Sequence, residues 1–82
     1  MSGHRTTDTE TFVYVRLLEE GTEVWRPVSA RRLPDGTFEL DEPEGYDPED
    51  EVWEFPPHAR VRCVLRRFAD GLSGLAAVMR TG

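Results

Sequence analysis

Short runs of β-branched and aromatic residues alternate with Gly, Pro and Asp along most of this chain, and this pattern limits the folds that are open to it. The apolar runs cover residues 12–18, 24–33, 37–40, 52–55, 60–68 and 74–79. Turn-forming residues separate them at about every tenth position, a spacing typical of small all-β domains. No segment of about ten residues has the periodicity of an amphipathic helix. We therefore expect an all-β fold, either a small SH3-like antiparallel barrel or a bent sheet of five to six strands. An OB-like barrel is less favoured, because that fold normally needs more residues.

The turns and strands carry local signals of their own. Residues 34–36 and 70–71 predict tight turns, because Gly accepts positive φ and Asp can accept a hydrogen bond from the backbone that follows it. Pro27 has no N–H to donate, so its strand lies at a sheet edge there or carries a bulge. The short run 74–79 follows a turn and is expected to be a strand. In the run 60–68, period-two alternation predicts inward positions at Val61, Cys63 and Leu65, and outward arginines at Arg60, Arg62 and Arg66.

The length of 82 residues allows one small domain with a single core. We expect a flexible polar tail over residues 1–11 and a single β domain over residues 12–80. So small a core leaves little room for an enclosed cofactor pocket, so we expect binding at the surface and no cofactor. Cys63 is the only cysteine, which excludes an intrachain disulfide, and we expect no metal site. No secretory signal or membrane-spanning run is evident, so we expect a cytoplasmic protein without membrane contact.

The net charge of −6 comes from one region of the chain. Residues 35–54 contain ten acidic residues and no basic one. Within them, the acidic loop of residues 41–51 is a candidate binding surface for a basic partner, carried by Asp47, Glu49, Asp50 and Glu51. The alternative interpretation is that the loop folds back onto the arginine-rich strand as solvated ion pairs. Calcium is disfavoured, because Pro43 and Gly45 stand where an EF-hand loop needs oxygen ligands.

The aromatic residues suggest a second candidate surface. Trp25, Tyr46 and Trp53, near the double proline at 56–57, would form an anchoring surface for a partner if they are exposed together. The alternative is that both Trp residues belong to the core. A third possibility is that the outward arginines bind single-stranded nucleic acid, with Tyr14 or Trp25 as a stacking platform. The net negative charge disfavours that partner.

The sequence contains no recognisable catalytic constellation. His58 follows two prolines, Cys63 has no neighbouring His or second Cys, and no nucleotide-binding fingerprint is present. We therefore predict a non-enzymatic protein-interaction module of unknown partner, a monomer or weak homodimer, that binds through an aromatic or acidic surface. The main alternative is a small acidic inhibitor or immunity-type protein that covers a basic site on its partner.

Residues 14–28, with their Val-Trp-Arg-Pro-Val segment, and residues 53–63, with Trp-Glu-Phe-Pro-Pro, resemble a family of small bacterial proteins to which no activity is assigned. The resemblance extends over about residues 12–78. It implies a free-standing bacterial domain and no particular ligand. Where that family usually has Gly after the double proline, this chain has His58.

Overall fold

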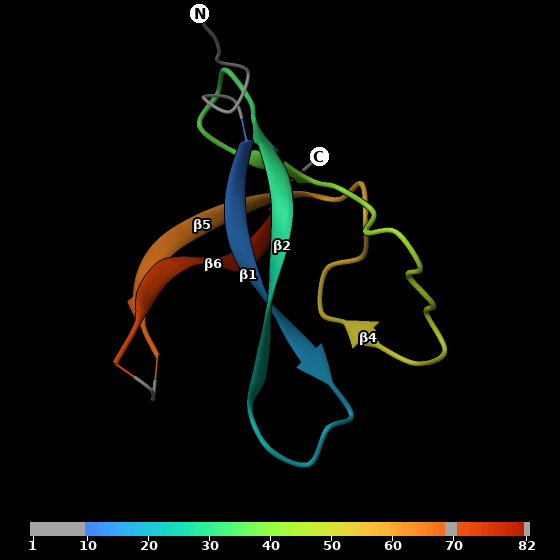
Figure 1. Cartoon of the computed structure of the whole chain (residues 1–82). Helices are drawn as coiled ribbons and strands as arrows, with labels where there is room; N and C mark the ends of the chain where they lie inside the picture. The colour runs from blue at the N-terminus through green and yellow to red at the C-terminus, as the bar shows by residue number, and fades with distance from the viewer. Residues whose placement is uncertain (1–9, 69–70, 82) are drawn as a thin grey trace, which may run out of the picture.

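The computed structural model describes residues 10–68 and 71–81, and within these residues the chain is folded into one strongly bent, six-stranded sheet (Figure 1). The strands are β1 (Glu10–Leu18), β2 (Val24–Arg32), β3 (Phe38–Leu40), β4 (Val52–Trp53), β5 (Arg60–Arg67) and β6 (Ser73–Thr81). The described part of the chain includes no helix, and so none that could cross a membrane. The prediction of an all-β bent sheet is confirmed, including the strand expected at 74–79.

Five of the strands are linked by hydrogen bonds into a ring in the order β1, β2, β3, β5, β6 and back to β1. Each of the first four pairings is antiparallel. An odd number of strands that reverse direction at each step leaves the first and last strands running the same way, so the closing pair must be parallel. It joins Val13 to Leu75 and Tyr14 to Ala76. The sheet is therefore the expected bent sheet, and it is mixed, because one of its pairings is parallel.

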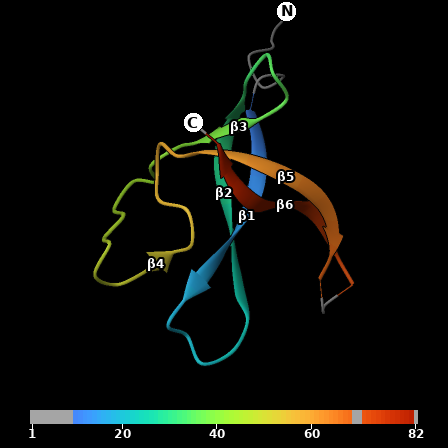
Figure 2. The ribbon, with the colours of Figure 1, turned by 180° about the vertical axis from the view of Figure 1, so that it is seen from behind.

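The short strand β4 lies outside the ring and pairs with the end of β1, where Trp53 is opposite Leu17 (Figure 2). The strand β1 begins earlier than its apolar run: Glu10 and Thr11, which the sequence placed in the tail, pair with β2. Residues 1–9 of the predicted tail lie outside the described residues. So does Asp70 of the predicted turn at 70–71.

The core follows from the alternation along each strand. Val13 and Val15 on β1, with Val28 on β2, point to the inside of the bend and are almost completely buried. Burial of an aliphatic side chain of this size contributes roughly 1.5–3 kcal/mol. These positions therefore stabilise the packing of the β1–β2 hairpin against the β5–β6 hairpin. Leu40, Val61 and Trp53 belong to the same cluster.

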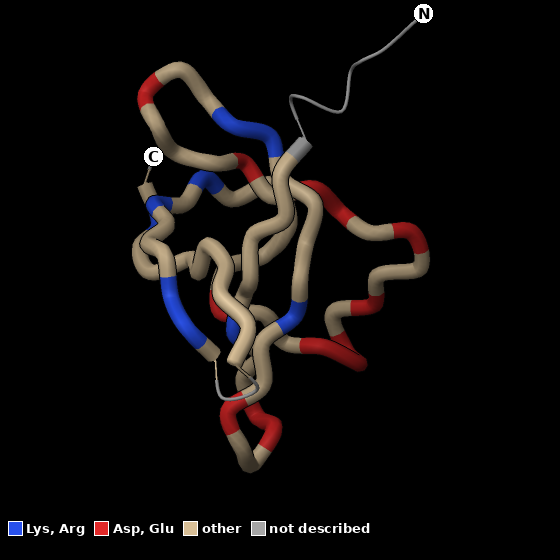
Figure 3. The backbone as a smooth tube through the Cα atoms, turned by 60° about the vertical axis from the view of Figure 1, so that its left-hand side comes forward, with Lys and Arg blue, Asp and Glu red and all other residues tan. Residues whose placement is uncertain are grey.

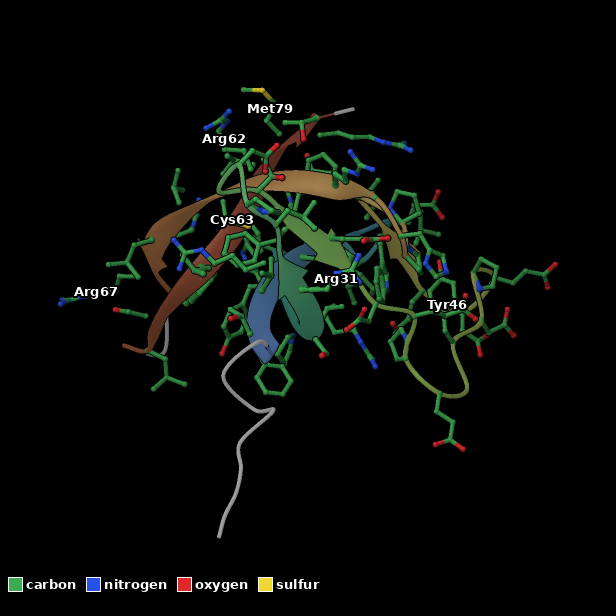
Figure 4. All side chains as sticks on the ribbon, turned by 90° about the horizontal axis from the view of Figure 1, so that it is seen from above. Arg31, Tyr46, Arg62, Cys63, Arg67 and Met79 are labelled. Atoms are coloured by element: carbon green, nitrogen blue, oxygen red, sulfur yellow. The ribbon has the colours of Figure 1, made fainter. Side chains whose placement is uncertain are left out.

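One inward position was predicted wrongly. Val61 is buried and Cys63 partly buried as expected, but Leu65 is 75% exposed. The hairpin of β5 and β6 extends past the end of its contact with β3, so the inner face near Leu65 has no strand opposite it. A register shift between Arg62 and Cys63 bends the hairpin at this point. Figure 4 shows Cys63 on the inside of the arch formed by β5, with Arg62 on the outside.

The turn at 34–36 forms by the predicted chemistry. The Asp35 carboxylate accepts hydrogen bonds from the backbone N–H and the hydroxyl of Thr37, and Gly36 has a φ of 88°. These bonds from Thr37 lower the pKa of Asp35 below its ordinary value. Pro27 pairs with Tyr14 on one side, while β3 contacts β2 only from Ala30 onward. Its strand is thus at an edge there, as its missing N–H requires.

Candidate functional site

Three aromatic rings from different parts of the chain meet outside the core. Tyr14 comes from β1, Trp25 from β2, and Phe68 directly follows β5. The ring centroids of Tyr14 and Phe68 are 4.6 Å apart, and those of Trp25 and Phe68 are 5.4 Å apart, both in tilted arrangements. Such pairs are attractive beyond the burial of their area. They form the floor of an open crevice between two hairpins.

This crevice, called here the hairpin groove, has a cavity volume of about 410 Å³. One wall is the β1–β2 hairpin and the other is the β5–β6 hairpin, which diverge in Figure 1. Its lining consists of Tyr14, Glu23, Trp25, Arg66, Arg67, Phe68 and Leu72. The volume is within the range of small-ligand sites, and the groove opens at the surface rather than within the core.

The positions of these rings follow from strand register. Tyr14 alternates with the buried Val13 and Val15, so its ring lies on the outer face of β1. Trp25 pairs with Arg16 on that same face. Gly74 on β6 allows the close approach of the second hairpin, because a Cβ atom there would lie 2.6 Å from Tyr14 Cε1. The groove thus depends on a position without a side chain.

The rim of the groove is a small polar network centred on Glu23. Its Oε2 atom accepts a hydrogen bond from Trp25 Nε1 at 3.0 Å and another from Arg66 Nη2 at 3.1 Å. The Arg66 guanidinium also lies over the Trp25 ring, with Cζ 5.0 Å from the ring centroid. Arg66 and Glu23 belong to different hairpins, so this ion pair connects the two walls. Both side chains are about half exposed, which limits the contribution of the pair to about 1 kcal/mol or less.

The predicted aromatic surface of Trp25, Tyr46 and Trp53 does not form. Trp53 pairs with the buried Leu17 and is only 5% exposed, whereas Trp25 pairs with the outward Arg16. The two Trp side chains therefore lie on opposite faces of β1 and its neighbours. Tyr46 packs edge-on against Trp53, with centroids 4.9 Å apart. Trp53 is a core residue, as the alternative interpretation had it, and only Trp25 belongs to the groove.

The sequence reasoning missed Phe68 and Glu23 as groove residues and gave Tyr14 a different role. Tyr14 was considered only as a stacking platform for nucleic acid, although its alternation with two valines marks it as an outward aromatic residue. In the sequence, Phe68 is the last residue of the apolar run 60–68. Its contact with Tyr14 depends on how the β5–β6 hairpin bends. Glu23 carries no local signal at all, because its partner Arg66 is far away in the chain.

The acidic loop is anchored at one end. Glu51 Oε2 accepts a hydrogen bond from Arg26 Nη1 at 2.8 Å, and its Oε1 accepts one from Trp53 Nε1 at 3.0 Å. Arg26 lies over the Trp53 ring, with Cζ 5.9 Å from the centroid, and its buried Nε has no partner among the described residues. Glu51 is therefore occupied by internal contacts. This contact is to β2 and not to the arginine-rich strand that the sequence suggested.

The other candidate residues of the loop have different surroundings. The Asp47 carboxylate accepts the Glu49 backbone N–H at 2.9 Å and so shapes a turn. Glu49 and Asp50 are exposed and, within residues 10–68 and 71–81, their carboxylates make no ion pair. Figure 3 shows the acidic loop and the arginines of the β5–β6 hairpin on different sides of the molecule. In the described part of the chain, no group of three or more potential ligands is placed to hold a metal ion.

The remaining chemically notable residues lie apart from the groove. Cys63 is half-buried, and this burial raises the pKa of its thiol from 9.0 to about 11. His58 has a φ of 72°, in the left-handed region, and its Nε2 lies 3.4 Å from a Glu42 oxygen. Arg31 on β2 forms an ion pair with Glu39 on β3.

Comparison of the chain with protein-family models, with curated proteins and with solved structures gave no match.

Proposed function

We propose that this protein is a non-enzymatic interaction module that binds an extended segment of a partner protein in the hairpin groove. The observation that supports the proposal is the meeting of Tyr14, Trp25 and Phe68 outside the core, in an open crevice of about 410 Å³. Aromatic residues and arginine dominate the binding energy of protein interfaces, because they bury large areas with few torsions to fix. A crevice of this size accommodates one or two side chains of such a segment.

The bent ring of five strands supports the same proposal at the level of the fold. We assign it to the SH3-like type, because a small five-stranded sheet closes on itself without a helix in its described residues. In domains of this kind, peptide recognition commonly uses a groove lined by aromatic rings. This type of fold therefore supports a peptide ligand.

A second candidate function is supported by the acidic loop. Glu44, Asp47, Glu49 and Asp50 are exposed, and none is paired with a described arginine. A surface of this kind would cover a basic site on a partner, as in an inhibitor or immunity-type protein. Such binding is steered by charge and weakens as salt shortens the screening length, to about 4 Å near 0.5 M.

The experiment that tests the proposal is selection of peptides from a displayed library of random dodecapeptides, followed by mapping of the selected peptides by amide NMR. We expect the peptides to shift the resonances of residues around Tyr14, Trp25 and Phe68. The variant Trp25→Ala should weaken binding about tenfold or more, because truncation of a central aromatic residue typically costs over 1.4 kcal/mol. A Glu49→Gln/Asp50→Asn variant is the matched control on the acidic loop.

Three results would count against the groove. Selection that yields no binder, or peptides that shift only residues 41–51, would overturn the proposal. Binding that is lost in the acidic-loop variant and at about 0.5 M salt, but unchanged by Trp25→Ala, would favour the second function.

A further inference from the structure

Resting on the proposed function, we infer that the hairpin groove recognises a carboxylate of an acidic partner peptide, and that Glu23 occupies the place of this carboxylate in the free protein. The geometry around one atom, Glu23 Oε2, supports both the chemistry of the ligand and the competing contact.

Two donors from the two walls of the groove converge on that atom. Trp25 Nε1 lies 3.0 Å from Glu23 Oε2, and Arg66 Nη2 lies 3.1 Å from it. An indole N–H and a guanidinium can only donate hydrogen bonds, so the point where they meet requires an acceptor. A carboxylate is the protein group that best satisfies a charged and a neutral donor together. The groove therefore has the hydrogen-bond donors of a carboxylate site, and the Glu23 carboxylate occupies that site in the free protein.

The internal occupant is easily displaced. Glu23 lies in the connection between β1 and β2, directly before the first residue of β2, and its side chain is 49% exposed in the ion pair. An exposed ion pair is only weakly favourable, so an open groove is a well-populated state. A carboxylate that arrives on a peptide gains the same two donors. It also brings neighbouring side chains to the rings of Tyr14 and Phe68, which the internal Glu23 does not.

The lining of the hairpin groove contains a third charged side chain. Arg67 borders the groove, is exposed, and makes no ion pair with any described residue. Figure 4 shows Arg67 and Tyr46, which lies in the acidic loop, on opposite sides of the molecule. The acidic loop is therefore remote from this donor. Among the residues that line the groove, the two arginines outweigh Glu23, which favours an anionic ligand.

The observations favour a peptide over nucleic acid. A single-stranded nucleic acid carries a phosphate at every nucleotide, so the net charge of −6 opposes it along its whole length. A peptide carboxylate interacts with the groove alone. The floor of three rings suits an aromatic or branched aliphatic side chain next to the acidic residue.

The test uses two variants that remove the same ion pair from opposite sides, Glu23→Gln and Arg66→Gln. Peptides are selected from the dodecapeptide library on the unmodified protein, and their dissociation constants are measured by fluorescence anisotropy. We expect the peptides to be enriched in Asp or Glu beside an apolar residue. Glu23→Gln should bind them about twofold to fivefold more tightly, because the competing carboxylate is weakened. Arg66→Gln should bind them about tenfold more weakly.

Matched controls separate this effect from net charge and from stability. Glu20→Gln makes the same charge change in the same turn, and Arg62→Gln makes it on the same strand; neither residue has an ion pair with a described residue. We expect each control to change affinity less than twofold, as for rim charges. Thermal unfolding of each variant confirms that it is folded.

The outcomes distinguish the two proposals. Peptides that bind the groove without acidic enrichment, or a loss of affinity in both variants alike, would overturn the role of Glu23 and leave the groove as a binding site. Failure to select any groove-binding peptide would overturn the proposed function itself. Tighter binding of labelled oligothymidylate than of every selected peptide, with the same dependence on Arg66, would show that the site recognises phosphate and would overturn the peptide assignment.

Discussion

Cys63 illustrates how position on a bent strand sets the chemistry of a single residue. It lies on the inside of the β5 arch (Figure 4), where desolvation disfavours its thiolate. Its pKa is thereby raised from 9.0 to about 11. Because only the thiolate reacts with electrophiles, Cys63 behaves in the folded protein as a small apolar side chain.

Alkylation by iodoacetamide measures this effect directly. At pH 8 the folded protein should react about a hundredfold more slowly than the urea-unfolded chain, since two pKa units reduce the thiolate fraction by that factor. The raised pKa also makes the free energy of unfolding depend on pH. As pH rises, the Cys63 thiol loses its proton in the unfolded chain before it does in the folded protein. The free energy of unfolding should therefore fall as pH rises above 9.0. Equal alkylation rates in the folded and the urea-unfolded protein would contradict the burial of Cys63.

His58 shows a residue in a backbone conformation that favours another residue type. Its φ of 72° places it in the left-handed region, which Gly adopts without a steric penalty. We expect His58→Gly to unfold with a free energy about 0.5–1 kcal/mol higher than His58→Ala, because Ala keeps the strain and both variants lose the contact with Glu42. Urea denaturation of the two variants provides the comparison. A more stable Ala variant would show that the turn has a different conformation.

At the scale of elements, local signals predicted most of the strands and failed where hairpins interact. The turn at 34–36 and the edge position of Pro27 follow from the chemistry of Asp, Gly and Pro themselves. The exposure of Leu65 and the parallel pairing of β1 with β6 do not, because both depend on how far one hairpin extends past its neighbours. Alternation tells which residues share a face but not whether anything covers that face.

The contact between the two hairpins gives a prediction at this scale. Gly74→Ala should lower the free energy of unfolding by about 1–2 kcal/mol, because the new methyl group displaces the Tyr14 ring from Phe68. In a Tyr14→Ala background the same change should be neutral or stabilise by about 0.5 kcal/mol, since Ala is less flexible than Gly. Chemical denaturation of the four proteins gives the coupling energy. Ser73→Ala, at the exposed neighbouring position, is the control, and additive effects would contradict the contact.

At the scale of the whole molecule, the sequence located the charge but only part of the candidate site. The acidic segment 35–54 can be recognised from the sequence alone. Figure 3 shows its loop separated from the arginines of β5 and β6. Trp25 was predicted as a binding residue, but its supposed companions Tyr46 and Trp53 pack with each other on the other face of the sheet. In the groove its companions are Tyr14, from the adjacent strand β1, and Phe68, which follows β5 and is far away in sequence. Such a site is a property of topology, which residue patterns specify only indirectly.

The parallel pair that closes the ring has a consequence for the order of events during folding. The β1–β2 and β5–β6 hairpins join residues that are close in sequence, so each can form early, whereas the pairing of Val13 with Leu75 must overcome the entropy of a long intervening chain. That late encounter also brings Tyr14 to Phe68. A chain that has formed both hairpins but not yet joined them has no groove, so the binding that we propose is open only to molecules that have completed their fold.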